Sequence, residues 1–315
     1  MPAATSGNPF TGVQTITVGP EREGQRVDNC LATLLKGVPR SMIYRLLRTG
    51  QVRINGKRAK PDTRLSAGDL LRIPPVRIAE REEAGAPPPA MLKQVTEAVI
   101  FEDRDFLALD KPAGIASHGG SGVSHGAIEL LRAARPREHL ELVHRLDRDT
   151  SGVLLFARTR TGLTGVQALI RGGEVKKQYL CLMTGTLKRA KFDVNAPLRK
   201  SVLSGGERMV RVDEEGKPAL TFFREIERYR GASLVEATLD TGRTHQIRVH
   251  AAHAGHPLAG DPKYGDREAN KRFRELGLKR LFLHAARFEF ELGERAYSIS
   301  APLPDDLKQV LDRLL

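Results

Sequence analysis

Apolar residues near the start of the chain recur at the spacing of short helices. Val27, Leu31 and Leu34 fall on one side of a helix over 27–37. A second helix over 41–50 is predicted with one apolar face, formed by Met42, Ile43, Leu46 and Leu47. We expect Ser41 to cap the start of this helix and Gly50 to close its end.

The segment that follows changes to the period of a strand. Residues 51–60 alternate between apolar and polar and turn at Asn55–Gly56, a dipeptide preferred in two-residue hairpins. Residues 67–74 return as a further strand. Two short helices followed by a small sheet predict a small α/β domain, which we place at 21–75. Residues 1–20 before it are expected to form a tail that does not pack.

Residues 74–93 differ in composition from the sequence on either side. They contain five prolines and a charged run, and few residues that could pack in a core. Such a segment is typical of a linker, which we place at 76–93.

The remainder of the chain, 94–315, shows no regular β–α alternation. Short β-rich runs recur, among them FLALDKP, GVLLFART, YLCLMTG, LTFFREIERY and SLVEATLD. Helical stretches such as AIELLRAA lie between them, and the strands outnumber the helices. This pattern predicts one α+β domain around a mixed, largely antiparallel sheet with flanking helices.

Composition restricts the class of protein. Of the 315 residues, 40% are hydrophobic and 28% are charged, as in a folded globular protein. No run approaches the ~18 consecutive apolar residues of a membrane-spanning helix. The two cysteines, Cys30 and Cys181, are too few for a disulfide framework, so we expect a reducing, cytoplasmic location.

The charge is strongly positive and unevenly spread. The formal net charge is +13, and residues 24–74 alone hold eleven Lys/Arg against three Asp/Glu, a surplus of eight. This surplus favours a nucleic-acid partner. A membrane surface is disfavoured, because no long basic helix with an aromatic face stands out in the sequence. The expected phosphate contacts are Arg40, Arg45, Arg48, Arg53, Lys57 and Arg58.

The densest group of reactive side chains lies in HRLDRDTSGVLLFART, residues 144–159. A charged loop attached to a buried strand is a common place for an active site. A solvated turn with local ion pairs is the alternative. The residues themselves do not decide between Asp147 and Asp149 as the reactive carboxylate.

A second candidate stretch is TGRTHQIRVHAAHAGHPLAGD, residues 241–261. Thr241 and Thr244 are each expected to cap a helix start, and Gly242 to allow a tight approach of the backbone. An arginine of this stretch could keep a distant aspartate ionised. The alternative is an amphipathic helix with a basic face.

Neither a metal nor a nucleotide cofactor is expected. The four histidines between 245 and 256 do not form the HExxH pattern, and no cysteine lies near them. The run HGGSGVSHG, residues 118–126, lacks the Gly-Lys-Ser/Thr ending of a phosphate loop.

Several of these motifs together resemble the RluA-type pseudouridine synthases. HRLDRDTSG, GRTHQIRVH and GHPLAGDPKYG are similar to family signatures, as are DKPAG at 110–114, QYLCL at 178–182 and LFLHA at 281–285. The basic N-terminal domain resembles an S4 RNA-binding domain. The resemblance covers roughly residues 24–315, nearly the whole chain.

The resemblance implies the pseudouridine synthase fold and the isomerisation of uridines in RNA without a cofactor. It implies that Asp147 is catalytic, that Arg145 helps displace the target base, that Tyr179 packs on the flipped uracil, and that Arg248 pairs with Asp147. The remaining substrate contacts are expected from the same two motifs, at His144, Leu146, Thr150, Gly242, Arg243, Thr244, His245 and Gln246.

The implied substrate is bacterial 23S ribosomal RNA, bound by a monomer. One alternative is an inert S4-type RNA-binding factor associated with the ribosome, and another is the same chemistry on tRNA. A nucleoside glycosidase is disfavoured, because such enzymes use two carboxylates at a set separation and only Asp149 offers a weak second.

Overall fold

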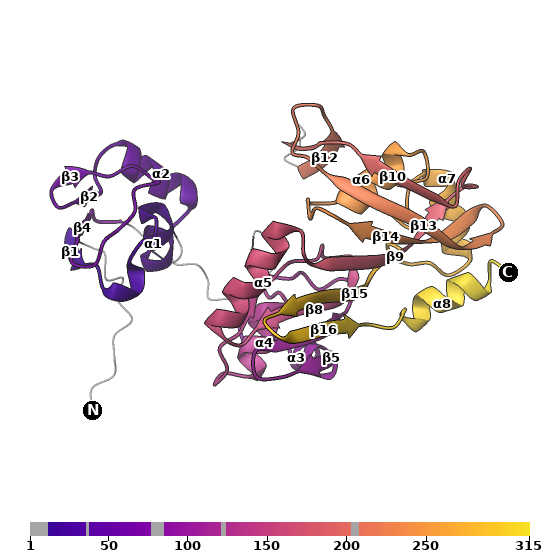
Figure 1. Ribbon diagram of the computed structural model, residues 1–315, viewed down its shortest axis with the longest axis horizontal. Helices are drawn as coiled ribbons and strands as arrows, with labels where there is room; N and C mark the ends of the chain where they lie inside the picture. The colour runs from indigo at the N-terminus through magenta and orange to yellow at the C-terminus, as the bar shows by residue number, and fades with distance from the viewer. Residues whose placement is uncertain (1–11, 36–37, 77–84, 121–123, 203–207) are drawn as a thin grey trace. The chain divides into compact units, whose positions relative to one another are not determined.

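The computed structural model describes residues 12–35, 38–76, 85–120, 124–202 and 208–315. The chain divides into two compact units, Met1–Gly85 and Ala86–Leu315 (Figure 1). Each unit has its own hydrophobic core.

The N-terminal unit is a small α/β domain, as the sequence predicts. A four-stranded antiparallel sheet in the order β1-β4-β2-β3 packs against two helices. Its elements are β1 (Gln14–Thr17), the 3-10 helix η1 (Pro20–Arg22), α1 (Val27–Leu34), α2 (Arg40–Arg48), β2 (Arg53–Ile54), β3 (Lys57–Arg58) and β4 (Leu70–Ile73). The hairpin at Asn55–Gly56 is confirmed, since both residues have positive φ, 50° and 78°, as a two-residue hairpin of type I′ requires.

Two details of this unit differ from the prediction. Ser41 does not cap α2, because the helix begins one residue earlier, after Pro39, and has no side-chain cap. Strand β1 lies inside the expected tail and pairs with β4, which gives this part of the tail backbone partners. Residues 1–11 of the predicted tail lie outside the described residues.

The linker prediction is wrong for residues 89–93. Helix α3 (Pro89–Glu97) begins there, with proline at its first position. Proline is favoured at this position because its missing N–H would have no partner in the first turn anyway. Val95 then buries its side chain in the core of the C-terminal unit. The linker residues 77–84 lie outside the described residues.

The C-terminal unit is built around one large sheet. Within the described residues, ten strands join in the order β10-β13-β14-β9-β15-β8-β6-β5, with β16 paired to β15 and β7 paired to β8. Every pair is antiparallel except β15 with β8, so the predicted mixed, largely antiparallel sheet is confirmed. The strands are β5 (Val99–Glu102), β6 (Phe106–Lys111), β7 (Glu141–Leu142), β8 (Ser151–Ala157), β9 (Lys176–Thr184), β10 (Lys191–Asn195), β13 (Leu220–Tyr229), β14 (Ala232–Leu239), β15 (Leu283–Leu292) and β16 (Arg295–Ser300).

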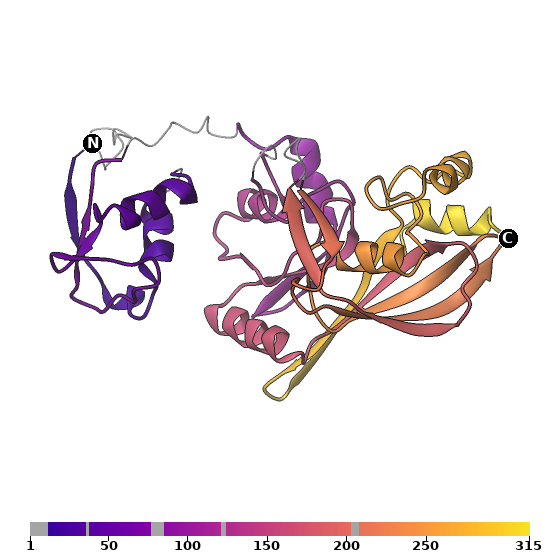
Figure 2. The ribbon, with the colours of Figure 1, turned by 90° about the horizontal axis from the view of Figure 1, so that it is seen from above.

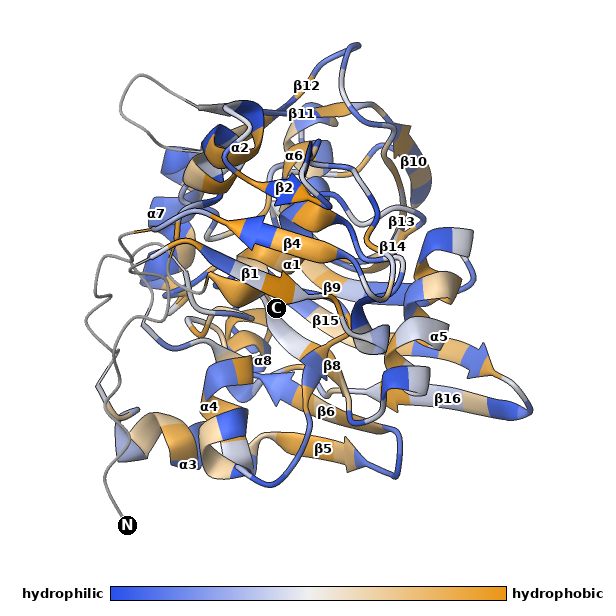
Figure 3. Cartoon of the chain, turned by 90° about the vertical axis from the view of Figure 1, so that its left-hand side faces the viewer, coloured by the Kyte–Doolittle hydropathy of each residue, from blue (hydrophilic) through white to orange (hydrophobic). Residues whose placement is uncertain are grey.

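Helices cover both faces of the sheet. On one face, α4 (Ala127–Ala134) and α6 (Gln246–His253) bury apolar side chains in the largest cluster. On the other face, α5 (Arg160–Gly172) packs over β8 and β15, and α7 (Arg267–Glu275) and α8 (Asp305–Asp312) pack over β9 and β14. Strand β8 is buried at every residue, which explains its unbroken apolar sequence after the first two positions. Figure 3 shows the apolar colouring of β5 and β6 and the two-sided colouring of α4.

A separate two-stranded ribbon, β11 (Leu198–Val202) and β12 (Arg208–Val212), stands beside α6 (Figure 2). Leu198 and Val210 of the ribbon bury their side chains with Val249 of α6. The ribbon thus forms a wall next to the start of α6.

The parallel contact between β15 and β8 requires a glycine. Gly152 pairs with Ala285 and has φ 108°. A Cβ at this position would collide with the backbone carbonyl of Ala285, so the two strands can meet only where a side chain is missing. The loop 144–150, which leads into β8, is therefore held at the middle of the sheet, close to β9 and β15.

Candidate active site

A pocket opens where the loop before β8 faces the start of α6. The pocket is lined by Arg145, Leu146, Asp147, Thr150, Tyr179, Leu239, Gly242, Arg243, His245, Gln246, Ile247, Arg248 and Leu283. Both stretches that the sequence singled out therefore meet in one place, together with the tyrosine of β9.

Asp147 lies at the edge of this pocket, and the backbone on both sides of it is fixed. The Leu146 N–H donates to Ser117 Oγ at 2.8 Å, and Ser117 Oγ donates back to the Leu146 carbonyl at 2.8 Å. On the other side, the Thr150 N–H donates to the carbonyl of Asp147 at 3.2 Å. The carboxylate is 24% exposed, so it can reach a ligand in the pocket.

Lys111 holds the same loop through hydrogen bonds from its buried side chain. Its fully buried ammonium donates to the carbonyls of Pro112 and Ile115, at 2.8 and 2.7 Å, and to that of Arg148 at 3.2 Å. Burial lowers the pKa of Lys111 to about 7, against the attraction of Asp149 and Asp147. Lys111 belongs to the DKPAG motif, but the sequence analysis assigned it no role.

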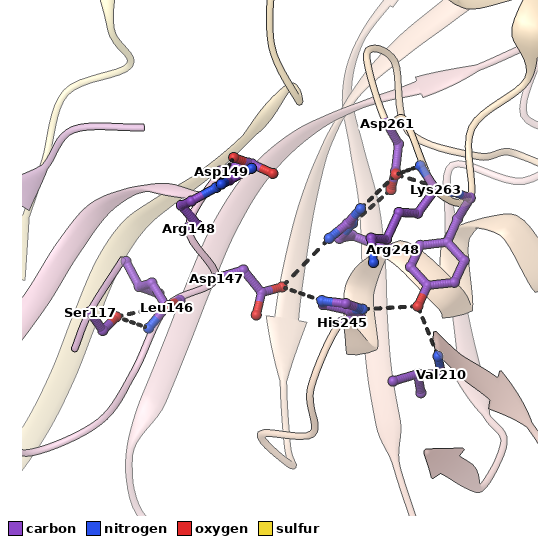
Figure 4. A network of polar contacts seen from close by, with 11 residues as sticks. Ser117, Leu146, Asp147, Arg148, Asp149, Val210, His245, Arg248, Asp261 and Lys263 are labelled. Carbon is purple, nitrogen blue, oxygen red and sulfur yellow. Dashed lines mark hydrogen bonds and ion pairs between the residues drawn. The ribbon is translucent and has the colours of Figure 1, made fainter. Parts of the chain in front are cut away.

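Two cationic or potentially cationic side chains face Asp147. His245 Nε2 is 3.8 Å and Arg248 NH1 is 3.9 Å from Asp147 Oδ2 (Figure 4). Burial lowers the pKa of His245, although the charge of Asp147 acts in the opposite direction. Arg248 places a permanent positive charge beside the carboxylate.

Arg248 faces Asp147 as expected, but its closest partner is Asp261. Arg248 Nε and NH2 donate to the two oxygens of Asp261 at 2.8 and 2.7 Å, while its distance to Asp147 is that of a looser ion pair. Burial disfavours the charge on Asp261, but the hydrogen bonds and charge of Arg248 outweigh it and lower the pKa of Asp261. Asp261 stands in the GHPLAGDPKYG motif, but the sequence analysis assigned it no role.

Tyr179 lies on the floor of the pocket. Its backbone pairs with Ala237 of β14 and Ala285 of β15, and the side chain is 9% exposed. Burial first, and the charge of Asp147 second, raise the pKa of Tyr179, so its hydroxyl stays protonated at neutral pH. Together with Leu239 and Leu283, Tyr179 gives the pocket an apolar part of its lining.

The start of α6 is organised by Gln246 and not by the threonines. Neither Thr241 nor Thr244 caps the helix, which begins after His245 with no side-chain cap. Instead, Gln246 Oε1 accepts hydrogen bonds from Thr241 Oγ1 and from the Arg243 N–H, at 2.8 and 3.0 Å. Among the described residues, the nearest atom to a Cβ built at Gly242 would be Lys177 Nζ at 4.0 Å, so the structure shows no close approach of backbone on that side.

His144 is the one expected substrate contact that borders neither the pocket nor a wider groove beside the pocket, which Asp149 and Lys200 line. Its ring stacks on Phe288 at 4.6 Å, and its Nε2 accepts the Leu155 N–H. Burial lowers the pKa of His144 to about 3, with a smaller effect from Lys177. The neutral ring thus anchors the loop to β8.

The geometry separates the two aspartates that the sequence left undecided. Asp149 is 36% exposed, pairs with Arg148 at 3.2 Å and does not border the pocket. It lines a wider groove beside the pocket instead. This groove also holds the remaining expected contact, Thr244, and the cations Arg145, Lys200 and Lys263.

The four histidines of the second stretch do not gather around a common point. His250 is buried, with Nδ1 against Thr221 Oγ1 and Nε2 against the Ala196 carbonyl, both at 2.9 Å. Among the described residues, no three His, Cys, Asp or Glu side chains converge as a metal site would require. Within the residues that the structure describes, no helix is both long and apolar enough to cross a membrane.

The six basic residues expected to contact phosphates are all exposed in the N-terminal unit. Three of them, Arg45, Arg48 and Arg58, line a groove together with Lys60 and the exposed ring of Tyr44. Arg53 and Lys57 stand on the β2–β3 hairpin, and Arg40 begins α2.

Comparison with known proteins agrees with this arrangement. Residues 105–253 match the model of the RNA pseudouridylate synthase family, and residues 25–71 match that of the S4 domain. The chain is 51% identical, over 309 residues, to a protein of Escherichia coli O157:H7 named ribosomal large subunit pseudouridine synthase C. The alignment covers 96% of this chain and 97% of that protein. The Pasteurella multocida protein of the same name is 50% identical over 308 residues, with 96% and 94% covered.

Two solved structures share this fold over about 70% of the chain. Human RNA pseudouridylate synthase domain containing 4 superposes with a TM-score of 0.60 at 24% identity, covering 71% of this chain and 95% of that chain. For human RNA pseudouridylate synthase domain containing 1, the TM-score is 0.56 at 24% identity, with 69% and 94% covered.

Proposed function

Because the chain belongs to the RNA pseudouridylate synthase family, we propose that it converts uridines of large-subunit ribosomal RNA to pseudouridine, with Asp147 as the catalytic residue. The observation that carries the assignment is the carboxylate of Asp147, which lines one pocket with Tyr179 and faces His245 and Arg248.

The reaction rearranges bonds within one nucleotide. The bond from N1 to C1′ breaks, the uracil rotates, and a bond from C5 to C1′ forms; the proton leaves C5 and N1 gains one. Atoms and electrons balance without a cofactor. Asp147 carries the covalent or proton-transfer step, for which it must be ionised.

The target base has to leave its helix before it can enter the pocket, at a cost of a few kcal/mol. Tyr179 stacks on the extruded base in this proposal, because its buried aromatic side chain lines the pocket. The exposed side chain of Arg145 borders both the pocket and the wider groove, from which it can occupy the space that the base leaves.

The substrate follows from the relatives and the charge. Relatives that are about half identical over almost their whole length are named for the large ribosomal subunit, and the net charge of +13 suits a polyanion. We therefore propose 23S ribosomal RNA of a bacterium as the substrate, acted on in the cytoplasm by a monomer.

The test is product formation by the purified chain. Transcripts of bacterial 23S ribosomal RNA labelled with tritium at uracil C5 should release tritium to water, because C5 loses its hydrogen when it binds C1′. Chemical mapping of pseudouridine then locates the sites. Tight binding with no release would favour the inert RNA-binding factor, and release from tRNA alone would favour the tRNA substrate.

A second prediction concerns the N-terminal unit. Replacing Arg40, Arg45 and Arg48 of α2 by glutamine together should weaken binding to the ribosomal RNA fragment and flatten the plot of log affinity against log salt. Each lost phosphate contact reduces this slope by about 0.7–0.9, so we expect a change of roughly two for the triple variant.

The matched control removes three exposed arginines of the C-terminal unit, Arg104, Arg160 and Arg171. This variant loses the same charge but should change the slope by less than one. Equal flattening by both variants would show that net charge, and not the α2 surface, determines RNA affinity.

A further inference from the structure

A chain of polar contacts connects Asp147 to the β11–β12 ribbon. The Val210 N–H of β12 donates to the Tyr264 hydroxyl at 3.0 Å, and this hydroxyl lies 2.9 Å from His245 Nδ1. His245 Nε2 in turn faces Asp147 Oδ2 (Figure 4). Neither motif analysis nor the proposed mechanism gives Tyr264 a role.

The direction of these hydrogen bonds follows from the charge of Asp147. A ring nitrogen that faces a carboxylate must carry a proton, because its lone pair would be repelled. In the neutral imidazole, Nδ1 is then an acceptor. Tyr264 already accepts from Val210, so its own proton is available to donate to Nδ1. Burial raises the pKa of Tyr264, which keeps that proton in place at neutral pH.

The backbone of His245 shows that its ring position is held from outside. His245 has φ 55° and ψ 19°, in the left-handed region that non-glycine residues rarely adopt. Such a conformation is unfavourable for a side chain with a Cβ and persists where the surroundings enforce it. Here the hydrogen bond to Tyr264 and the edge-to-face contact of the two rings at 5.6 Å hold the side chain.

Tyr264 also supports Arg248, the other side chain that faces Asp147. The guanidinium of Arg248 lies over the Tyr264 ring, 5.1 Å from its centre. The Tyr264 N–H donates at 3.1 Å to Asp261, which binds Arg248. One residue therefore contacts both groups that face the carboxylate.

We infer that Tyr264 is a positioning residue, which fixes the tautomer and orientation of His245 so that its Nε2–H points at the Asp147 carboxylate. The inference rests on the proposed role of Asp147. Through the Val210 amide, the same contact ties the β11–β12 wall of the substrate groove to the site.

The first test is Tyr264→Phe in the full chain, which keeps the ring and removes the hydroxyl. We expect the single-turnover rate of pseudouridine formation to fall about tenfold, with the RNA dissociation constant within twofold of wild type. The control is Tyr229→Phe, which removes another buried, hydrogen-bonded hydroxyl, bound to Glu227 at 2.7 Å, and should keep the wild-type rate. A wild-type rate for Tyr264→Phe would overturn the inference.

A double-mutant cycle tests whether Tyr264 acts through His245. His245→Ala should lower the rate at least as much as Tyr264→Phe, and adding Tyr264→Phe to it should cause no further loss. Multiplied effects of the two changes would contradict the inference.

The tautomer can be measured without turnover, so this test is independent of the proposed function. In protein labelled with ¹⁵N-histidine, the His245 resonances, assigned with the His245→Ala variant, should show a proton on Nε2 and none on Nδ1 at neutral pH. Tyr264→Phe should produce a mixture of tautomers. A proton on Nδ1 in the wild type would overturn the inference even if the enzyme makes pseudouridine.

Discussion

Asp147→Asn is expected to abolish pseudouridine formation, lowering the single-turnover rate by four orders of magnitude or more. Losses of this size follow when the group that carries the covalent or proton-transfer step is removed. RNA affinity should stay within a few-fold, because the carboxylate is small beside the basic surfaces that hold the phosphates. The measurement is tritium release from C5-labelled ribosomal RNA, with RNA binding measured in parallel.

Asp149→Asn is the matched control, two residues along the same loop. Its carboxylate pairs with exposed Arg148 and does not border the pocket. We expect this variant to keep its rate within about tenfold, since an exposed ion pair contributes only ~0–1 kcal/mol. If Asp149→Asn lost activity while Asp147→Asn kept it, the catalytic assignment would move to Asp149.

Asp261→Ala should strongly destabilise the protein, by about 3–5 kcal/mol in the free energy of unfolding. Asp261 is 1% exposed and accepts both hydrogen bonds of Arg248, which is 3% exposed. Without it, the arginine keeps its charge in a buried site with no close partner, and this is the costly way to break an ion pair. Denaturant unfolding measures the loss.

The control for Asp261→Ala is Asp306→Ala. Asp306 also accepts two hydrogen bonds from an arginine, Arg280, at 2.6 and 3.1 Å, but its side chain is 57% exposed. Removing this pair should cost less than ~1 kcal/mol. Similar losses for the two variants would mean that burial does not determine the strength of the Arg248–Asp261 pair.

The contribution of Asp261 should also depend on pH. Its pKa in the folded protein lies below the ordinary value, so the folded state favours the ionised form. The stabilisation is therefore fully present above the unfolded pKa of ~3.9 and is lost as the pH falls through the lower, folded pKa. The stability difference between wild type and Asp261→Ala should be constant near neutral pH and shrink below about pH 4.

Local patterns in the sequence determined most of the elements. The apolar faces of α1 and α2, the Asn55–Gly56 hairpin and the buried strand β8 stand where the spacing predicted them, because burial follows periodicity within one element. The positive charge of the N-terminal unit was equally visible, since charge is a property of composition. The motifs 144–150 and 241–248 indicated the site, and it was the family resemblance that implied their meeting, through a pair of Arg248 with Asp147.

Only the tertiary structure decided which side chains face one another. It placed Asp147 at the pocket and Asp149 outside it, gave Arg248 the partner Asp261, turned His144 onto Phe288, and brought Tyr264 to His245. Three of these contacts join segments that are distant in the chain. The fourth finding separates two aspartates of one loop by the direction in which their side chains point. Periodicity carries no information on either, because the relative direction of side chains on different elements is fixed only when the sheet and helices pack.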